Sequence, residues 1–189
     1  RVTNVKGRVN SFHRAADATD SRWIFIVTAK LKVNAQFDFG WQPDMLQQPK
    51  HYVFHAHNPM TGLEYGHVAM VAYNRMMLYE NDGGGLDFTL NQAHEVVPLL
   101  SGTVNMGNDD TVIWRTTFRE VIKLKHRLSQ MPDIEASHRL RKWCTQGTPA
   151  SMQAANDAVE YYDSVDGEFE KLKLSYEWEW LDQYRNSLS

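Results

Sequence analysis

Residues 51–57, HYVFHAH, constrain the fold of this chain more than any other stretch. Successive side chains of a β-strand point to opposite faces, so His51, His55 and His57 are expected to share one face. Tyr52 and Phe54 would share the other. One face of this strand is therefore suited to binding and the other to packing.

A second strand is predicted close behind the first. Residues 58–62, NPMTG, combine a strand breaker with turn-forming residues. The apolar run at 68–73 then indicates a strand. The segment between the two strands is expected to be a loop that presents Glu64 and His67.

Residues 23–33, WIFIVTAKLKV, begin as a continuous apolar run and then alternate. This pattern is typical of a strand that is buried at its start and emerges into a cleft at its end, where α/β sheets bind ligands. Thr28 and Lys30 would stand at the emerging end. The alternative for Lys30 is an ordinary edge lysine.

Helical periodicity dominates the second half of the chain, where apolar residues recur every three to four positions. The predicted helices are 9–18, 112–128, 134–144, 150–164 and 168–184. The sequence therefore predicts an α/β or α+β fold, with a mixed sheet in residues 1–111 and C-terminal helices in residues 112–189.

Arg115, Arg119 and Lys123 recur every four residues along the predicted helix 112–128. Stacked cations repel one another unless something anionic lies alongside. A phosphate ligand is one such partner. The acidic tail is the other, because residues 112–143 carry 8 Lys+Arg against 3 Asp+Glu, whereas residues 144–189 carry 3 against 9. Both alternatives stay open.

Composition limits the class of protein. At 189 residues, with 42% hydrophobic and 23% charged content, the chain suits a single domain, 1–189, with a buried core. Its apolar runs fall far short of the ~18 residues that cross a bilayer, so no membrane partner is expected. The single cysteine, Cys144, excludes an internal disulfide and suits a reducing compartment, so a cytoplasmic protein is predicted.

Glu64, Asp87 and His94 are the candidate catalytic acids or bases, because nearby glycine or turn residues would expose each of them. The glycines of residues 80–85, ENDGGG, permit close approach of the backbone to a ligand, and a flexible hairpin or lid is the alternative. This segment matches neither a P-loop nor a dinucleotide fingerprint. A short strand is predicted at 86–90 and a polar loop at 101–111.

A metal site is the alternative use of the histidine strand. The His-x-His spacing of His55 and His57 occurs in zinc sites. No acidic third ligand follows at a diagnostic interval, so histidines that pack or bind a partner are favoured and no metal is expected.

Several blocks of the chain, taken in order, resemble a known family. They are WIFIVTAKLKV, FDFGWQPD, HNPMTGLEYGH, GLDFTL, HEVVPLLSG and WRTTFREVIKL. Over about residues 9–181 the chain is similar to the glycosyltransferase-like domains of tailed phages related to the TET/JBP-associated glycosyltransferases. The resemblance implies a GT-A-like mixed sheet, a nucleotide-sugar donor such as a UDP-sugar, and transfer of the sugar to a hydroxymethylated base in phage DNA, inside the host cell.

One departure from that family changes the expected chemistry. The family's strand that matches residues 23–33 ends in an Asp-x-Asp pair that holds a divalent metal on the donor diphosphate, whereas this chain has Thr28-Ala29-Lys30. An ammonium group repels a divalent cation and attracts a diphosphate, so metal-independent donor binding is expected. The donor-binding candidates are Lys30, His55, His57, Arg115, Arg119 and Lys123.

Too little chain precedes this strand for the family's nucleotide-binding half. Either that half lies in an upstream domain or partner, or the elements are rearranged, or the domain binds without catalysing. Two functions therefore stand: a glycosyltransferase in which Glu64 or Asp87 activates the acceptor hydroxyl, and a non-catalytic module that binds nucleic acid or a protein partner.

Overall fold

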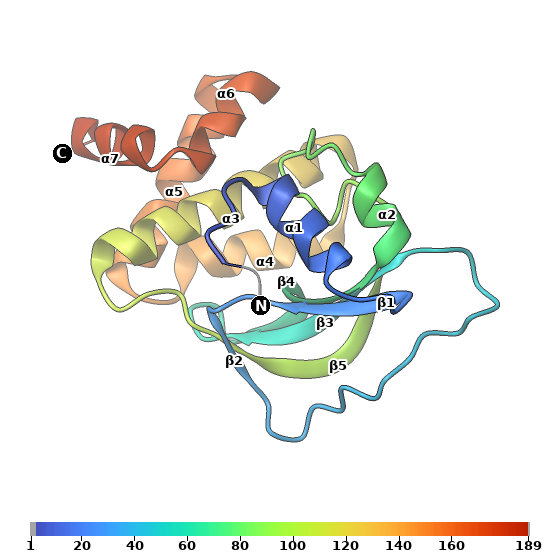
Figure 1. The fold of residues 1–189 in the computed structure, drawn as a ribbon. Helices are drawn as coiled ribbons and strands as arrows, with labels where there is room; N and C mark the ends of the chain where they lie inside the picture. The colour runs from blue at the N-terminus through green and yellow to red at the C-terminus, as the bar shows by residue number, and fades with distance from the viewer. Residues whose placement is uncertain (1–2, 189) are drawn as a thin grey trace. The chain divides into compact units, whose positions relative to one another are not determined.

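The computed structural model describes residues 3–188 and shows a mixed α/β protein (Figure 1). Within these residues a five-stranded sheet has the order β1-β4-β3-β5-β2, and helices follow it toward the C-terminal end. The predicted class, a mixed sheet followed by C-terminal helices, is confirmed. The elements are α1 (Arg8–Asp17), β1 (Trp23–Val27), β2 (Leu31–Val33), β3 (His51–Asn58), β4 (Leu63–Asn74), α2 (Arg75–Glu80), β5 (His94–Val104), α3 (Asp110–Gln130), α4 (Ile134–Thr145), α5 (Pro149–Ser164), α6 (Phe169–Lys173), a 3-10 turn (Leu174–Tyr176) and α7 (Trp178–Ser187).

The chain folds into two compact units, which are described separately below. The first unit holds the sheet and comprises the chain up to Asn58 together with Glu64–Asn105. The second unit is helical and comprises Pro59–Leu63 and the chain from Met106 onward.

The sheet of the first unit combines both strand directions. β3 and β5 run parallel, while β1 pairs antiparallel with β4, and β2 pairs antiparallel with β5. The strands predicted at 51–57 and 68–73 are confirmed, because they lie within β3 and β4.

One face of this sheet is covered by α1 and α2. Ala16 of α1 and Leu78 of α2 are fully buried against Val53, Val71 and Tyr73 of the sheet. The helix predicted at 9–18 is confirmed as α1, and its apolar stripe is the side that packs here. Burying each large apolar side chain contributes about 1.5–3 kcal/mol, so this layer is a main source of stability.

The single strand predicted at 23–33 is wrong, because a turn divides it into β1 and β2. The Thr28 amide donates to the Ala69 carbonyl on β4 (2.9 Å), and the Leu31 amide donates back to the Thr28 carbonyl (3.0 Å). The second bond closes a turn between β1 and β2, although these two strands occupy opposite ends of the strand order.

This short turn requires a strongly curled sheet. In a flat sheet, four strand spacings of about 4.8 Å would separate the outer strands by roughly 19 Å. A turn of this kind holds its ends within about 7 Å, so the sheet bends until its two outer strands meet there. Register shifts between β3 and β5 on both sides of His55 bend the strands in addition.

Two further expectations for the first unit are corrected. The strand predicted at 86–90 is wrong, because the Asp87 carboxylate accepts hydrogen bonds from the amides of Thr89 (3.0 Å) and Leu90 (3.2 Å) and holds the segment in turns. The polar loop predicted from residue 101 is wrong at its start, because β5 continues to Val104 and pairs there with β2.

The second unit contains the helices predicted at 112–128, 134–144 and 150–164, which are confirmed as α3, α4 and α5. The side chains that cap their first turns by accepting backbone amides are Asp109, Asp133 and Thr148. No helix among residues 3–188 is long and apolar enough to cross a lipid bilayer.

The single helix predicted at 168–184 is wrong, because the tail divides into α6, a 3-10 turn and α7. Glu177 has extended backbone (φ −100°, ψ 114°) and separates the turn from α7. The predicted aromatic packing does form: Trp180 and Tyr184 of α7 stack on each other with ring centroids 5.1 Å apart, and both contact Phe118 of α3.

Candidate functional site

A connected aromatic cluster covers the second face of the sheet in the first unit. Its ring centroids lie 5.0–6.0 Å from their neighbours. The strands supply Trp23, Phe25, Tyr52 and Phe54, and the connection between β2 and β3 supplies Phe37, Phe39 and Trp41. We call this connection, residues 34–50, the aromatic loop.

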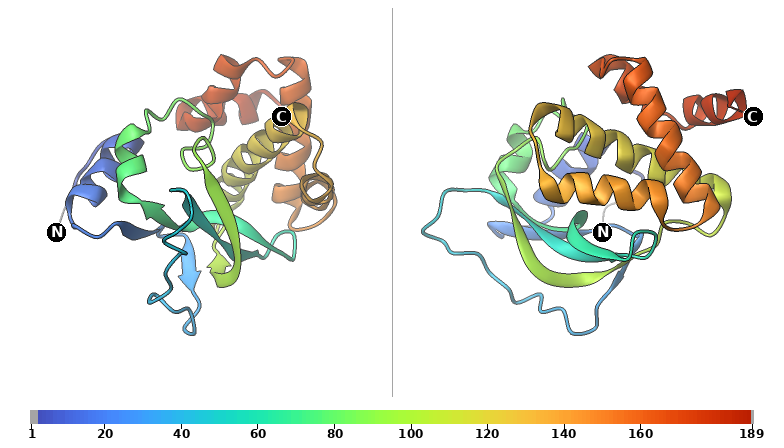
Figure 2. Two further views of the ribbon diagram at one scale, coloured as in Figure 1. Left: turned by 90° about the vertical axis from the view of Figure 1, so that its right-hand side faces the viewer. Right: turned by 180° about the vertical axis from the view of Figure 1, so that it is seen from behind.

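The aromatic loop has 17 residues and no helix or strand. Ordered loops of this length in compact proteins usually carry a function. Its start is fixed to β5, since the Asn34 amide donates to the Ser101 carbonyl (2.8 Å). Figure 2 shows it running outside the sheet before it returns to β3. Three side chains hold its turns by accepting an amide two residues ahead: Asn34 (3.1 Å), Asp38 (2.7 Å) and Asp44 (2.9 Å).

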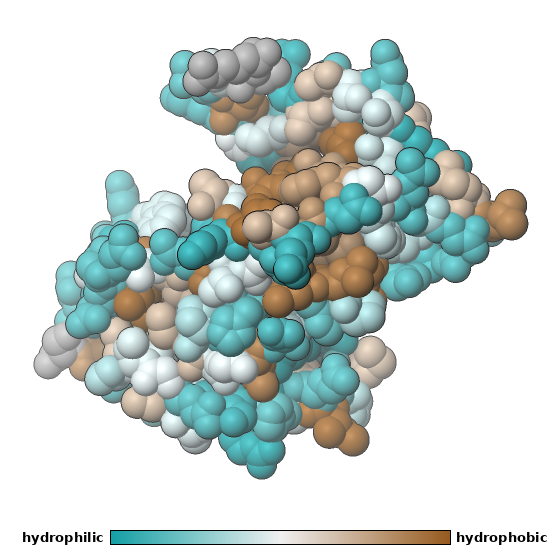
Figure 3. Space-filling model, turned by 90° about the horizontal axis from the view of Figure 1, so that it is seen from below, coloured by the Kyte–Doolittle hydropathy of each residue, from teal (hydrophilic) through white to brown (hydrophobic). Residues whose placement is uncertain are grey.

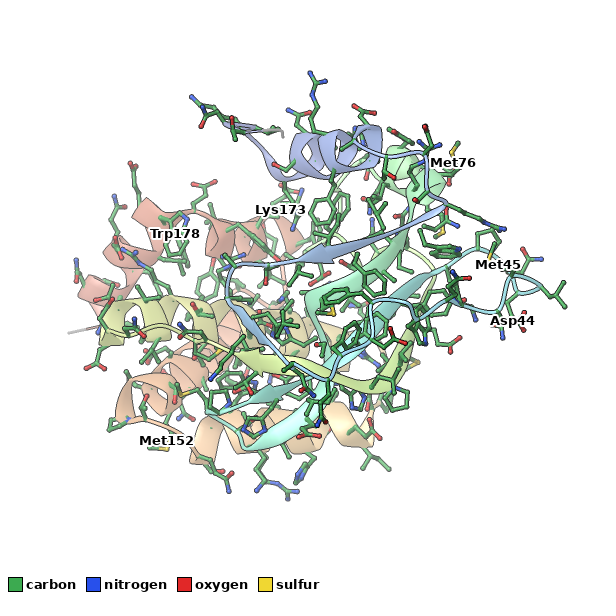
Figure 4. The ribbon with its side chains drawn as sticks, turned by 60° about the horizontal axis from the view of Figure 1, so that its bottom comes forward. Asp44, Met45, Met76, Met152, Lys173 and Trp178 are labelled. Carbon is green, nitrogen blue, oxygen red and sulfur yellow. The ribbon has the colours of Figure 1, made fainter. Side chains whose placement is uncertain are left out.

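The tip of the aromatic loop presents apolar side chains to solvent. Met45 is 49% exposed and Leu46 is 96% exposed. Figure 4 shows Asp44 and Met45 on the outer part of the loop, and Figure 3 shows apolar surface in brown among hydrophilic surface, viewed from the side along which the loop runs. Scattered exposed apolar side chains are common, but two adjacent ones on an ordered loop make this tip a candidate surface for interaction.

His51, at the start of β3, is fully buried and has a structural role. Its Nδ1 accepts the Asn74 amide (3.2 Å), so the ring proton lies on Nε2 and is donated to Gln92 Oε1 (2.8 Å). Burial lowers the pKa of His51, because a charged imidazolium is poorly solvated there.

His57 and Glu64 meet at the other end of β3. The distance between His57 Nδ1 and Glu64 Oε1 is 4.0 Å, and both side chains are partly exposed. The expected loop carrying Glu64 and His67 is wrong, because both residues lie on β4. His67 is buried and its Nδ1 accepts the Ala69 amide (3.0 Å).

The structure does not bring all three candidate acids and bases together. His94 pairs in register with His51, whereas Glu64 lies beside His57. Six residues of β3 separate these two places, which is about 20 Å along a strand. The Asp87 carboxylate is already used by the backbone of its own turn.

The donor-binding candidates are divided between the two units. Lys30, His55 and His57 lie in the first unit and are half-buried. Lys30 stands in the turn after β1, at the end of a strand as expected, and its carbonyl accepts the Asn105 amide (2.7 Å).

The predicted ladder of cations lies along α3 in the second unit. Arg115 forms a two-point ion pair with Asp182 of α7, in which the Nε–Oδ1 distance is 2.7 Å. The geometry therefore supports pairing with the acidic tail for this residue. The other two cations have partners as well: the Arg119 guanidinium lies 4.4 Å from the Tyr176 ring centroid, and Lys123 Nζ lies 3.1 Å from Glu120.

Among the residues that the structure describes, no three His, Cys, Asp or Glu side chains are placed to hold one metal ion. Donor binding without a divalent metal stays a prediction. It concerns the contact between Lys30 and a donor, which the positions of possible metal ligands do not test.

No protein family, curated protein or solved structure matches this chain in our comparisons. The likeness to phage glycosyltransferases therefore rests on the sequence blocks alone. Met45 and Leu46 were not among the residues predicted from the sequence. The signal was present in residues 43–49, PDMLQQP, where an apolar pair follows a turn-forming aspartate between two prolines.

Proposed function

We propose that this chain is a binding module that engages a protein partner through the tip of the aromatic loop. The observation that carries the proposal is Leu46, which is 96% exposed although the Asp44 carboxylate fixes the backbone beneath it. Burying a leucine side chain is worth about 1.5–3 kcal/mol relative to leaving it in water. A partner with an apolar pocket recovers that free energy.

The construction of the loop favours tight contact. Its aromatic side chains hold its base on the sheet, and its turns are already formed, so little conformational entropy is lost on binding. Residues 34–49 contain Asp38 and Asp44 but no Lys or Arg. This charge disfavours a nucleic-acid backbone, which selects cationic surfaces, and it favours a protein partner.

Leu46→Asp is expected to weaken partner binding by roughly 30-fold, equivalent to about 2 kcal/mol of lost apolar burial. Because the side chain is exposed in the isolated chain, stability is expected to change by less than about 0.5 kcal/mol. Partners are captured with the native chain from its source cells and identified, and the purified partner is then titrated calorimetrically.

Gln48→Asp is the matched control, since Gln48 is also exposed in the aromatic loop and the substitution adds the same charge. It is expected to bind within about threefold of the native chain. Equal affinities of the Leu46→Asp and Gln48→Asp variants for the partner would show that the tip of the aromatic loop does not contact the partner.

Sugar transfer is a second proposed function, and what supports it is Lys30, a half-buried cation in the turn after β1, because an ammonium group attracts phosphate. In this proposal Lys30 attracts the diphosphate of a UDP-sugar, and Glu64 or Asp87 activates the hydroxyl of modified DNA. The reaction would take place in the cytoplasm, with an upstream domain or partner completing the donor site.

Lys30→Ala tests this second proposal with UDP-glucose as the probe. A ligand at a hundred times its Kd stabilises a protein by roughly 2.7 kcal/mol, which thermal unfolding detects. Excess chelator is expected to leave the stabilisation intact, Lys30→Ala to abolish it, and Lys32→Ala to retain it, because Lys32 is exposed two residues further on. A strict need for manganese, or full stabilisation of Lys30→Ala, would contradict the proposal.

A further inference from the structure

An exposed tryptophan lies between two exposed glutamates at the start of α7 in the second unit. Trp178 is 51% exposed, and Glu177 and Glu179 on either side of it are exposed as well. The Arg115 guanidinium lies 4.9 Å from the centroid of the indole ring and supports it from one side. Tryptophan is enriched where proteins meet, so this acidic segment, residues 177–179, suits contact with a surface that is both apolar and cationic.

The two glutamates keep their charge unpaired within the unit. Other acids supply its ion pairs, since Asp182 pairs with Arg115 and Asp163 pairs with Lys125 (3.1 Å). Within residues 3–188 neither Glu177 nor Glu179 has a cation at ion-pair distance. No Lys or Arg occurs between residues 174 and 184. The acidic segment therefore presents uncompensated negative charge to solvent.

The exposed face of α4 has the complementary chemistry. Ala136 and Trp143 are the buried residues of this helix, and the opposite stripe consequently faces solvent. Ile134 begins that stripe and is 90% exposed. Arg141 lies on the same stripe two turns further on, about 10 Å along the helix axis, and Lys142 follows it.

The positive charge of this face is also uncompensated. α4 has three cations, Arg139, Arg141 and Lys142, whereas its single acid is Glu135. In the part of the chain that the structure describes, Arg141 and Lys142 form no ion pair. The Arg141 guanidinium donates instead to His138 Nδ1 (3.3 Å). An apolar side chain beside unpaired cations is the surface that the acidic segment requires.

We propose that the acidic segment of one copy of this chain docks on the exposed face of α4 in a second copy. Trp178 then covers Ile134, and the glutamates pair with Arg141 and Lys142. The occupant is a second copy because one chain carries both surfaces, which are opposite in charge and each have an exposed apolar side chain. The contact joins two different surfaces, so the copies associate head to tail.

The salt dependence of self-association is the first test. Analytical ultracentrifugation of the intact chain over a range of protein concentrations gives the dissociation constant between copies. We expect association at about 50 mM NaCl and a dissociation constant at least roughly tenfold higher at about 500 mM, where the screening length falls to about 4 Å. A chain that stays monomeric at low salt would overturn the proposal.

Exchanging the charges distinguishes this contact from any other. Arg141→Glu alone and Glu179→Arg alone each place like charges against each other, and each is expected to raise the dissociation constant at least roughly tenfold. In an equal mixture of the two variants every acidic segment and every α4 face meets an opposite charge, so association is expected to return. The controls are Lys6→Glu and Glu80→Arg, exposed sites in the first unit with the same changes of net charge, which are expected to associate like the native chain.

Ile134→Ser tests the apolar part of the same contact without altering charge. It is expected to raise the dissociation constant roughly tenfold, because the isoleucine side chain no longer leaves water. This variant also decides the proposal if a charge reversal prevents folding, which circular dichroism detects. Native association of Ile134→Ser, native association of either charge reversal, or a mixture of folded variants that stays dissociated would each contradict docking on α4.

Discussion

Asp157→Ala is expected to lower the free energy of unfolding of the second unit by about 3 kcal/mol. Asp157 is buried on α5, where Oδ2 accepts Trp114 Nε1 of α3 (2.7 Å) and Oδ1 accepts Gln153 Nε2 (2.7 Å). Alanine would leave the buried indole N–H without an acceptor, which costs about 1–3 kcal/mol. The space between the two helices adds a cavity cost.

Urea unfolding measures the lost free energy of unfolding. Hydrogen exchange of peptides from α3 and α5 then assigns the loss to the second unit. Asp157→Asn keeps an acceptor for Trp114 and is expected to cost only about 1 kcal/mol. Glu160→Ala, an exposed site on the same helix, is expected to stay within about 0.5 kcal/mol of the native chain. A loss below about 1 kcal/mol for Asp157→Ala would show that the indole finds another partner.

The helices of the second unit could be predicted because their signals are local. Apolar spacing and capping residues such as Asp109, Asp133 and Thr148 lie within a few positions of the structure that they determine. The contact between Trp114 and Asp157 could not be predicted, because 43 residues separate the two side chains. In the sequence Asp157 is one of several acids in the tail.

The spacing of the cations along α3 could be predicted from the sequence, but their partners could not. The spacing of Arg115, Arg119 and Lys123 indicated that an anionic partner lies beside them. Both a phosphate ligand and the acidic tail were compatible with that spacing. The bend of the tail at Glu177 precedes α7, whose Asp182 pairs with Arg115. The sequence predicted an unbroken helix there, so this pairing could not be derived from it.

Strand alternation predicted a shared face for the histidines but not their different surroundings. His51 is buried because Gln92, 41 residues away, lies over it, whereas His57 at the other end of β3 is partly exposed. The curl of the sheet was missed for a similar reason. Thr28-Ala29-Lys30 contains no glycine or proline, so the turn between β1 and β2 left no local signal.

Gly102→Ala is expected to have the largest effect on the first unit, at least about 4 kcal/mol of lost stability or failure of β2 to pair. Gly102 lies on β5, beside Ala56 of β3 and Val33 of β2. A Cβ at this position would lie 2.2 Å from the Lys32 carbonyl oxygen and 2.9 Å from the Lys32 carbonyl carbon. Both are backbone atoms, so no side-chain rotation relieves the overlap and β2 must move away from β5.

The loss is expected to extend to the aromatic loop, because this loop begins where β2 ends and is fixed to β5 through Asn34 and Ser101. Hydrogen exchange of β2 and β5 peptides reports the strand pairing, and titration of the partner reports Leu46. Gly84→Ala is the matched control, since its Cβ would meet only the Asp82 side chain (3.1 Å) and is expected to cost less than about 1 kcal/mol. Equal protection of β2 in the two variants would mean that the strands adjust to a Cβ at position 102. If Gly102→Ala loses both the protection of β2 and the affinity for the partner, the pairing of β2 with β5 positions the tip of the aromatic loop.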